Sequence, residues 1–358
     1  MRGKNEGSIF LDKQRKMYRA MYYTPCGERI SKRFTRRAEA SEWLALQQVS
    51  VAKNEFIERH DWNFGEWLEE FLEVYAQPRV RVKTFERYQS LIKHLKPLNH
   101  VKLQQLSGIE FQKLYNSMNT YSGETRSKVH KICKMALNQA VADHLIYSNP
   151  LMTLKAPKIE RKDIEIFEQN EISVILSAPF VNNHRWKCVI LVAAKGGLRI
   201  SEILGLRWCD LDYEKRGINI NQGLHSVRGG LIVEQPKTRS SKRFVALPEF
   251  VFVELSRSKL EKQAFKDDGY IFTNLSGTPV CVHNFQRFWR TIFKNIDVPY
   301  RNFHSLRHSH ATFLLSKGIP IVEVSRRLGH SKTSVTLDVY AHAMPKTADA
   351  KIIQVLEE

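Results

Sequence analysis

Four short patches in the second half of the 358-residue chain hold side chains that could act together on a phosphate group. They are 197–202 with Arg199 and Glu202, 236–239 with Lys237, 304–308 with His304 and Arg307, and 328–330 with His330, followed by Tyr340. Arginine presents a planar fork of donors that matches phosphate oxygens, and histidine moves protons near neutral pH. A lysine can donate a proton, and a tyrosine hydroxyl becomes a nucleophile once its proton is removed. No carboxylate cluster suited to Mg²⁺ accompanies them in the sequence, so cationic side chains would have to stabilise the charge. The set predicts phosphoryl transfer on a nucleic-acid backbone.

The overall charge agrees with a polyanionic partner. Lys and Arg number 56 against 37 Asp and Glu, which gives a net charge of +19. The longest apolar run, 188–194, is far shorter than the roughly 20 residues that cross a bilayer. The N-terminus has no apolar leader, and five scattered cysteines without CxxC spacing fit a reducing compartment. We therefore expect a protein of a reducing compartment, such as the cytoplasm, that binds nucleic acid and not membrane.

The first domain is predicted over residues 1–60, as a small sheet with one helix. Strands are expected at 17–23 and 29–35, with a third at 8–11, and a helix at 37–55. This region carries 13 Lys and Arg against 7 Asp and Glu. The basic residues expected to contact DNA here are Arg15, Lys16, Arg19, Lys32 and Arg33. The alternative is a solvated charged face on a small adaptor.

The second domain is predicted over residues 61–155 as entirely helical. Apolar residues recur at helical spacing in four segments, and Ser107 with Glu110 forms a capping-box signature before the third. The second helix is expected to stop at Pro97. A basic stretch precedes that helix and suits phosphate contacts, although a solvated loop would look the same. Its residues are Arg79, Arg81 and Lys83.

The third domain is predicted over residues 172–358, after a charged linker at 156–171 that lacks periodicity. Helical patterns flank the Gly196-Gly197 pair, and short strands are expected near 218–221, 231–235 and 243–247. The rest of the domain is expected to be helical. The fold class is therefore multidomain α+β: a three-stranded sheet plus helix, an all-helical domain, and a mainly helical domain with a small antiparallel sheet.

The ordered set Arg, Lys, His-x-x-Arg, His and Tyr resembles the tyrosine recombinase, or phage integrase, family. The resemblance covers the whole of 172–358. The two preceding domains resemble the family's helical domain that binds core DNA sites and its three-stranded domain that binds arm sites. The family's shorter members generally lack the N-terminal unit, so its presence favours an integrase of a mobile element over a recombinase that resolves chromosome dimers.

The resemblance implies which side chains would hold the phosphate. Arg199 and Arg307 would clamp the non-bridging oxygens and stabilise the pentacoordinate transition state. His330 would orient the phosphate through a hydrogen bond. Glu202 would support the site without reacting.

The resemblance also implies which side chains would form the covalent bond and transfer protons. Tyr340 would be the nucleophile and would form a 3′-phosphotyrosine bond. His304 would help to accept the tyrosine proton, and Lys237 would protonate the leaving 5′-oxygen. Because the covalent bond conserves the phosphodiester energy, no ATP, metal or other cofactor is expected.

Several residues near these candidates have interpretations that give them no part in the reaction. The role given to Lys237 has an alternative, because its basic neighbours could simply contact backbone phosphate; they are Lys242, Arg239 and Arg243. Arg239 is expected to bind DNA. His308 is interpreted as a packing or backbone-bonding residue. A zinc site with His304, His308 and His310 is disfavoured, because no HExxH motif or acidic third ligand lies nearby.

The implied function is that of a site-specific DNA recombinase that integrates or excises a prophage or conjugative element. It would act as a homotetramer on double-stranded attachment sites of core and arm type. A DNA-bending host factor and an excision or directionality factor are further partners to consider. Two other functions stay open: a type IB topoisomerase, and a DNA-binding regulator with an inactive catalytic fold.

Overall fold

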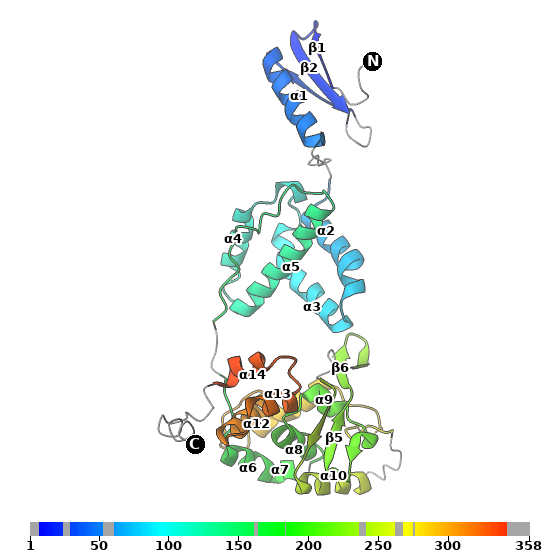
Figure 1. Ribbon diagram of the computed structural model, residues 1–358, viewed down its shortest axis with the longest axis vertical. Helices are drawn as coiled ribbons and strands as arrows, with labels where there is room; N and C mark the ends of the chain where they lie inside the picture. Colours follow the sequence, from blue (N-terminus) through cyan, green and yellow to red (C-terminus); the bar gives the residue numbers. More distant parts are fainter. Residues whose placement is uncertain are drawn as a thin grey trace, which may run out of the picture. The chain divides into compact units, whose positions relative to one another are not determined.

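The chain folds into two compact units in a computed structural model, Met1–Arg161 and Lys162–Glu358 (Figure 1). The structure describes residues 7–23, 29–52, 61–160, 164–182, 184–235, 241–261, 268–274 and 276–341. Both units combine helices with small antiparallel sheets, so the predicted α+β class is confirmed. Within the described residues, no helix is long and apolar enough to cross a membrane.

The first unit begins with a three-stranded antiparallel sheet in the order β1-β2-β3, with helix α1 packed against it (Figure 1). The elements are β1 Ser8–Asp12, β2 Met17–Tyr23, β3 Arg29–Phe34 and α1 Arg37–Ala52. Alternate residues of β2 point toward the helix, where Ala20 and Tyr22 pack with Ala40 and Leu44. The predicted sheet and helix are confirmed. The turn expected at 24–27 and the helix end after residue 52 lie outside the described residues.

A separate helical core follows in the same unit. Its α-helices are α2 Phe64–Glu70, α3 Val82–Ile92, α4 Gly108–Ser117 and α5 Gly123–Ala142. A π-helical segment (Phe71–Ala76) and a 3-10 turn (Gln77–Arg79) continue α2, and 3-10 turns also occur at Lys93–Leu98 and Leu103–Gln105. The predicted capping box forms, because the Ser107 N–H donates to Glu110 Oε2 at 2.8 Å. The predicted stop at Pro97 is displaced: the α-helix ends at Ile92, and a 3-10 turn carries the chain through the proline.

The second unit surrounds the apolar helix α8 (Lys187–Gly196) with further helices and two small sheets. The other helices are α6 Gln169–Ser177, α7 Pro179–Asn182, α9 Ile200–Leu204, α10 Glu249–Glu261, α11 Val282–Ile292, α12 Ser305–Ser316, α13 Ile321–Leu328 and α14 Thr333–Tyr340, with a 3-10 turn at Trp208–Asp210. The strands are β4 Leu211–Asp212, β5 Gly217–Ile220, β6 Gly223–Val227, β7 Gly230–Glu234 and β8 Arg243–Ala246. One sheet has the order β4-β5-β8, and β6 pairs with β7 as a hairpin.

Two expectations for this unit need correction. The sequence does not predict the strands β4 and β6. The segment 156–171 is not a linker throughout, because Phe167 is fully buried against Trp289 and Phe293, and α6 begins at Gln169. An aromatic side chain of this size stabilises the unit by burial, so the chain is anchored before the predicted boundary at residue 172.

Candidate active site

The break between α8 and α9 positions the first arginine. Helix α8 is capped by Gly197, whose left-handed φ of +69° reverses the chain. A Cβ at Gly197 would lie 2.6 Å from the His310 ring, so only glycine fits. Arg199 is then the N-cap of α9, and its N–H donates to Glu202 Oε2 at 2.9 Å. The arginine and the carboxylate are therefore fixed to each other by the first turn of the helix.

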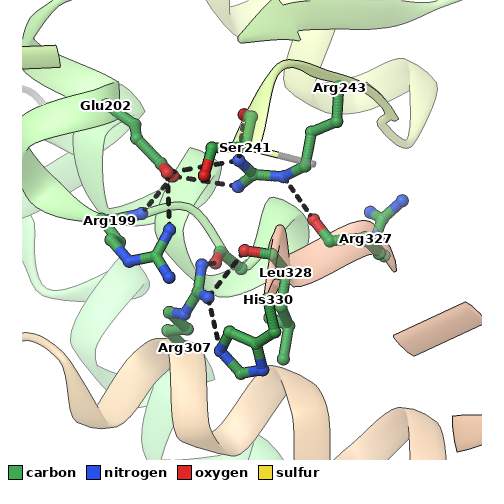
Figure 2. Close-up of polar contacts among 9 residues, drawn as sticks. Arg199, Glu202, Ser241, Arg243, Arg307, Arg327, Leu328 and His330 are labelled. Atoms are coloured by element: carbon green, nitrogen blue, oxygen red, sulfur yellow. Dashed lines mark hydrogen bonds and ion pairs between the residues drawn. The ribbon is translucent and has the colours of Figure 1, made fainter. Parts of the chain in front are cut away.

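Glu202 bridges two guanidinium groups (Figure 2). Its Oε1 accepts from Arg199 Nη1 at 2.8 Å, and its Oε2 accepts from Arg243 Nη2 at 2.9 Å. Burial alone would raise the pKa of Glu202, but the hydrogen bonds and charges of the two arginines outweigh it and lower the pKa to about 2. The group is an ionised, buried carboxylate that holds Arg199 in place.

The sequence suggests Arg243 as a contact to backbone phosphate, and this interpretation is wrong. Its side chain is only 4% exposed. Its Nε donates to the carbonyl of Arg327 at 2.6 Å, at the end of α13, while its other nitrogens face Glu202. Arg243 lies on β8 and links this strand to α9 and α13, so it is a buried support of the site.

The second arginine, Arg307, is held by carbonyl groups from two separate segments. It lies in the first turn of α12 and is 2% exposed. Nη1 donates to the Gly197 carbonyl at 2.8 Å, and Nη2 donates to the Leu328 carbonyl at 2.7 Å (Figure 2). Burial, with the charge of Arg199, lowers the pKa of Arg307 to about 9, so the guanidinium stays charged at neutral pH.

The segment Leu328-Gly329-His330 positions a carbonyl group and an imidazole at Arg307. Gly329 caps α13 with a φ of +67°, and a Cβ there would lie 2.8 Å from an Arg243 nitrogen. The reversal directs the Leu328 carbonyl toward Arg307 and also brings His330 Nε2 to 3.0 Å from Arg307 Nη2. His330 Nδ1 lies 2.8 Å from Thr336 Oγ1, so the ring is fixed on both sides.

Tyr340 is the last residue of α14 and is 2% exposed. Its ring packs in a small core formed by α12, α13 and α14, and its hydroxyl lies 2.6 Å from His308 Nδ1. Burial raises the pKa of Tyr340 to about 12 despite the opposing charges of Arg307 and Arg199. The hydroxyl is therefore protonated at neutral pH. His308 is not the packing or backbone-bonding residue expected from the sequence, because it contacts the tyrosine oxygen.

His304 precedes α12 and lies one turn before His308. The two rings meet edge to face, with their centroids 4.8 Å apart. Although part of its surface is exposed, burial lowers the pKa of His304 to about 4, with help from His308, Arg307 and Arg199. The pKa values of His308 and His330 are also lowered to about 4, first by burial and then by Arg307. All three imidazoles are neutral at pH 7 and can accept protons.

The geometry thus collects two fixed guanidinium groups, three neutral imidazoles and one buried tyrosine. Comparison with known proteins identifies the fold that carries them. Residues 165–347 match the phage integrase family, and residues 63–119 match the N-terminal SAM-like domain of phage integrases. The chain belongs to the phage integrase family of tyrosine recombinases.

Individual relatives of this tyrosine recombinase agree with the assignment. It is 30% identical to a XerC-like tyrosine recombinase of Caldanaerobacter subterraneus subsp. tengcongensis, over 89% of this chain and 90% of that protein. It is 28% identical to the transposase of transposon Tn916 from Enterococcus faecalis, over 68% and 64% of the two chains.

Among solved structures, the Tn1549 transposon integrase in complex with a circular intermediate DNA shares the fold. The TM-score is 0.70 at 19% identity, covering 83% of this chain and 99% of that one. A lambda integrase tetramer bound to a Holliday junction gives a TM-score of 0.60 at 16% identity, covering 91% and 96%.

Two predicted site residues of this recombinase, Lys237 and Arg239, lie outside the described residues. His310 belongs to the scaffold, since its Nδ1 lies 3.1 Å from the Ala194 carbonyl and its Nε2 accepts from Arg327 Nε at 2.9 Å. In the described part of the chain, no group of three or more His, Cys, Asp or Glu could hold a metal ion.

The basic residues expected to bind DNA in the N-terminal sheet divide between its two faces. Arg19 and Arg33 are register partners on the face turned away from α1, and Arg19 Nη2 donates to Ser31 Oγ at 2.9 Å. Lys32 lies on the helix side, with its ammonium 5.4 Å from the Phe34 ring centre. Adjacent strand residues point to opposite faces, so Lys32 and Arg33 lie on different faces of the sheet. Arg15 and Lys16 lie in the turn between β1 and β2.

The basic residues of the helical domain gather where α3 begins. Arg79 ends the 3-10 turn after α2, with its guanidinium 5.9 Å from the Tyr75 ring centre. Arg81 is the N-cap of α3, and Lys83 lies in its first turn. Their place at a helix N-terminus remains consistent with the predicted phosphate contacts.

Proposed function

We propose that this protein is a site-specific integrase that cleaves and rejoins DNA strands through a covalent 3′-phosphotyrosine intermediate. One observation carries the proposal: the Tyr340 hydroxyl is hydrogen-bonded to a neutral imidazole in the same cluster as two guanidinium groups fixed by carbonyls and a carboxylate. A binding protein would not need a protonated nucleophile beside a base.

The chemistry follows from this charge pattern. A phosphodiester between Arg199 and Arg307 would gain negative charge as it becomes pentacoordinate, and the two fixed cations would stabilise that charge most in the transition state. His330, already in contact with Arg307, is placed to bind the same phosphate. The Tyr340 oxygen forms the bond to phosphorus as the bond to the 5′-oxygen breaks. Lys237 is assigned the proton for that leaving oxygen by the family resemblance.

We further propose that the substrate is a pair of double-stranded attachment sites belonging to a mobile element. The curated relatives include the ICEBs1 integrase of Bacillus subtilis and the integrase of Staphylococcus phage L54a, which support either a conjugative element or a prophage. The active assembly is proposed to be a homotetramer on DNA, with the helical domain on core sites and the N-terminal sheet on arm sites. This activity would take place on the nucleoid of a bacterial cytoplasm, with a DNA-bending factor and an excision factor as partners.

Trapping the covalent complex tests the proposed reaction. A duplex carrying a candidate site from DNA that flanks the gene, nicked near the cleavage point, loses the strand end needed for religation. We expect wild-type protein to form a denaturant-resistant adduct with it in EDTA, since arginine and lysine supply the charge stabilisation. Mass spectrometry should find the phosphate on Tyr340.

Two other outcomes would favour the other functions. Relaxation of a supercoiled plasmid that lacks attachment sites, by a monomer, would indicate a type IB topoisomerase. Tight binding to an attachment site whose cleavage point is known, without any adduct, would indicate a DNA-binding regulator.

The two faces of the N-terminal sheet provide a test of arm binding. Replacing Arg19 and Arg33 together by glutamine should weaken binding to arm DNA and reduce the slope of log affinity against log salt by about 2, roughly one for each phosphate that the variant no longer neutralises. Lys32→Gln, on the opposite face, is the matched control and should leave the slope unchanged. An equal change in slope from Lys32→Gln and from the double variant would show that the face turned away from α1 is not the DNA-binding surface.

A further inference from the structure

The nearest imidazole to the tyrosine nucleophile is His308 and not His304. His308 Nδ1 lies 2.6 Å from the Tyr340 hydroxyl oxygen. His304 is the N-cap of α12, one helical turn earlier, and its ring contacts the His308 ring edge to face, with the centroids 4.8 Å apart. The helix therefore presents two adjacent imidazoles, of which the second makes the hydrogen bond to the reacting oxygen.

The protonation states match a donor hydroxyl and an acceptor imidazole. Burial and the charge of Arg307 lower the pKa of His308 to about 4, so its ring is neutral at pH 7. Tyr340 keeps its proton because burial raises its pKa to about 12. A phenol is a better donor than a neutral imidazole N–H, and an imidazole nitrogen is a better acceptor than a phenol oxygen. The hydroxyl therefore donates to Nδ1, and the ring carries its own proton on Nε2.

We propose that His308 is the catalytic residue that accepts the Tyr340 proton during strand cleavage. As the tyrosine oxygen bonds to phosphorus and the bond to the 5′-oxygen breaks, the hydroxyl proton passes to Nδ1 and His308 becomes an imidazolium. When a 5′-hydroxyl attacks the phosphotyrosine, the imidazolium returns that proton to the departing tyrosine. This inference rests on the proposed function, because it assigns a role within the same reaction.

The approach of DNA strengthens this base. Burial and, after it, the charge of Arg307 hold the histidine neutral, and a phosphate bound at Arg307 would bring a negative charge that opposes the effect of that arginine on His308. His304 contacts the His308 ring edge to face and is available to contact the phosphate or to hold His308 in position. The tight packing of Tyr340 against α12 preserves the geometry of proton transfer.

Asparagine and alanine at position 308 separate basicity from the hydrogen bond. In His308→Asn, the amide oxygen can take the place of Nδ1 and accept the tyrosine hydrogen bond, but it cannot take the proton. We expect single-turnover cleavage of the nicked duplex to slow about 100-fold or more, as is typical when a general base is lost, with unchanged DNA affinity. His308→Ala should be as slow, and added imidazole should restore part of its rate.

A substrate with sulfur in place of the bridging 5′-oxygen shows whether His308 is a base for the tyrosine or an acid for the leaving group. A thiolate has a conjugate-acid pKa of about 8.5 and leaves without a proton, so it bypasses any general acid. We expect this substrate to leave His308→Asn slow, because the tyrosine still needs a base. Full recovery would overturn the proposal and make His308 an acid for the leaving group.

His304→Asn is the matched control, one turn away on the same helix. We expect it to slow cleavage less than His308→Asn does. The reverse order, or wild-type cleavage rates in a folded His308→Asn, would overturn the role of His308 while leaving the proposed function intact. If wild-type protein itself formed no adduct at a mapped site, the proposed function would fail first.

Discussion

Tyr340→Phe should abolish the covalent protein–DNA adduct while leaving DNA affinity nearly unchanged. The substitution removes only the hydroxyl oxygen that would bond to phosphorus. The ring keeps its packing in the core of α12, α13 and α14, so the groups proposed to bind the phosphate stay in place. Adduct formation on the nicked duplex and binding to the intact site, measured on the same preparation, separate chemistry from recognition.

The same substitution has a small structural cost that must be measured beside it. His308 Nδ1 loses its hydrogen-bond donor, which costs about 1–3 kcal/mol for a buried acceptor left unsatisfied. A modest fall in melting temperature is therefore expected, without loss of the fold. Tyr300→Phe is the control, because this exposed tyrosine packs edge-on against Phe293 and takes no part in the site. A persistent adduct in Tyr340→Phe would move the nucleophile to another residue.

Long periodic helices, and the side chains that gather at the candidate site, are predictable from the sequence. The stripe at Phe64, Trp67 and Phe71 specifies a buried helical face whatever surrounds it. The Gly196-Gly197 pair also marks a true break, because only glycine tolerates the left-handed turn against His310. Such features depend on local geometry, which the sequence records directly.

Contacts between distant segments are not predictable in the same way. Arg243 and His308 look like ordinary neighbours of motif residues, yet the first pairs with Glu202 across 41 residues and the second contacts Tyr340 across 32. The charged neighbours of Phe167 suggest a linker, but its ring is buried against Trp289, far along the chain. The strand β6, Gly223–Val227, cannot be predicted from its own composition, because it forms through its pairing with β7.

The largest effect on stability is expected from Glu202→Gln. Glutamine keeps the capping contact to the Arg199 N–H, so the substitution removes the charge and little else. Arg243, 4% exposed, then loses its counter-charge, and removing one partner of a buried ion pair costs about 3–5 kcal/mol. Chemical unfolding of wild type and variant at pH 7 measures the loss. Cleavage should also slow, since Arg199 is no longer held against a carboxylate.

A matched control exists elsewhere in the same unit. Glu171 occupies the same third position of helix α6, accepts from the Glu168 N–H at 2.8 Å, and pairs with Arg301 at 2.9 Å. That pair is more exposed, at 17% and 18%, against 11% and 4% for Glu202 and Arg243. Glu171→Gln should therefore cost less stability and leave cleavage unchanged. Equal losses from the two variants would mean that burial of Arg243 does not set the cost.

The dependence on pH isolates the Glu202 carboxylate from all other charges. Its pKa is about 2 in the folded chain against an ordinary value of 4.5, so its stabilisation is complete above pH 4.5 and is lost as the pH falls toward 2. At 1.36 kcal/mol for each pKa unit, the stability gap between wild type and Glu202→Gln should shrink by about 3 kcal/mol across that window. Other carboxylates titrate alike in both proteins and cancel in the difference. A gap that stayed constant between pH 5 and pH 3 would show that the ionised carboxylate is not what holds Arg243 and Arg199 together.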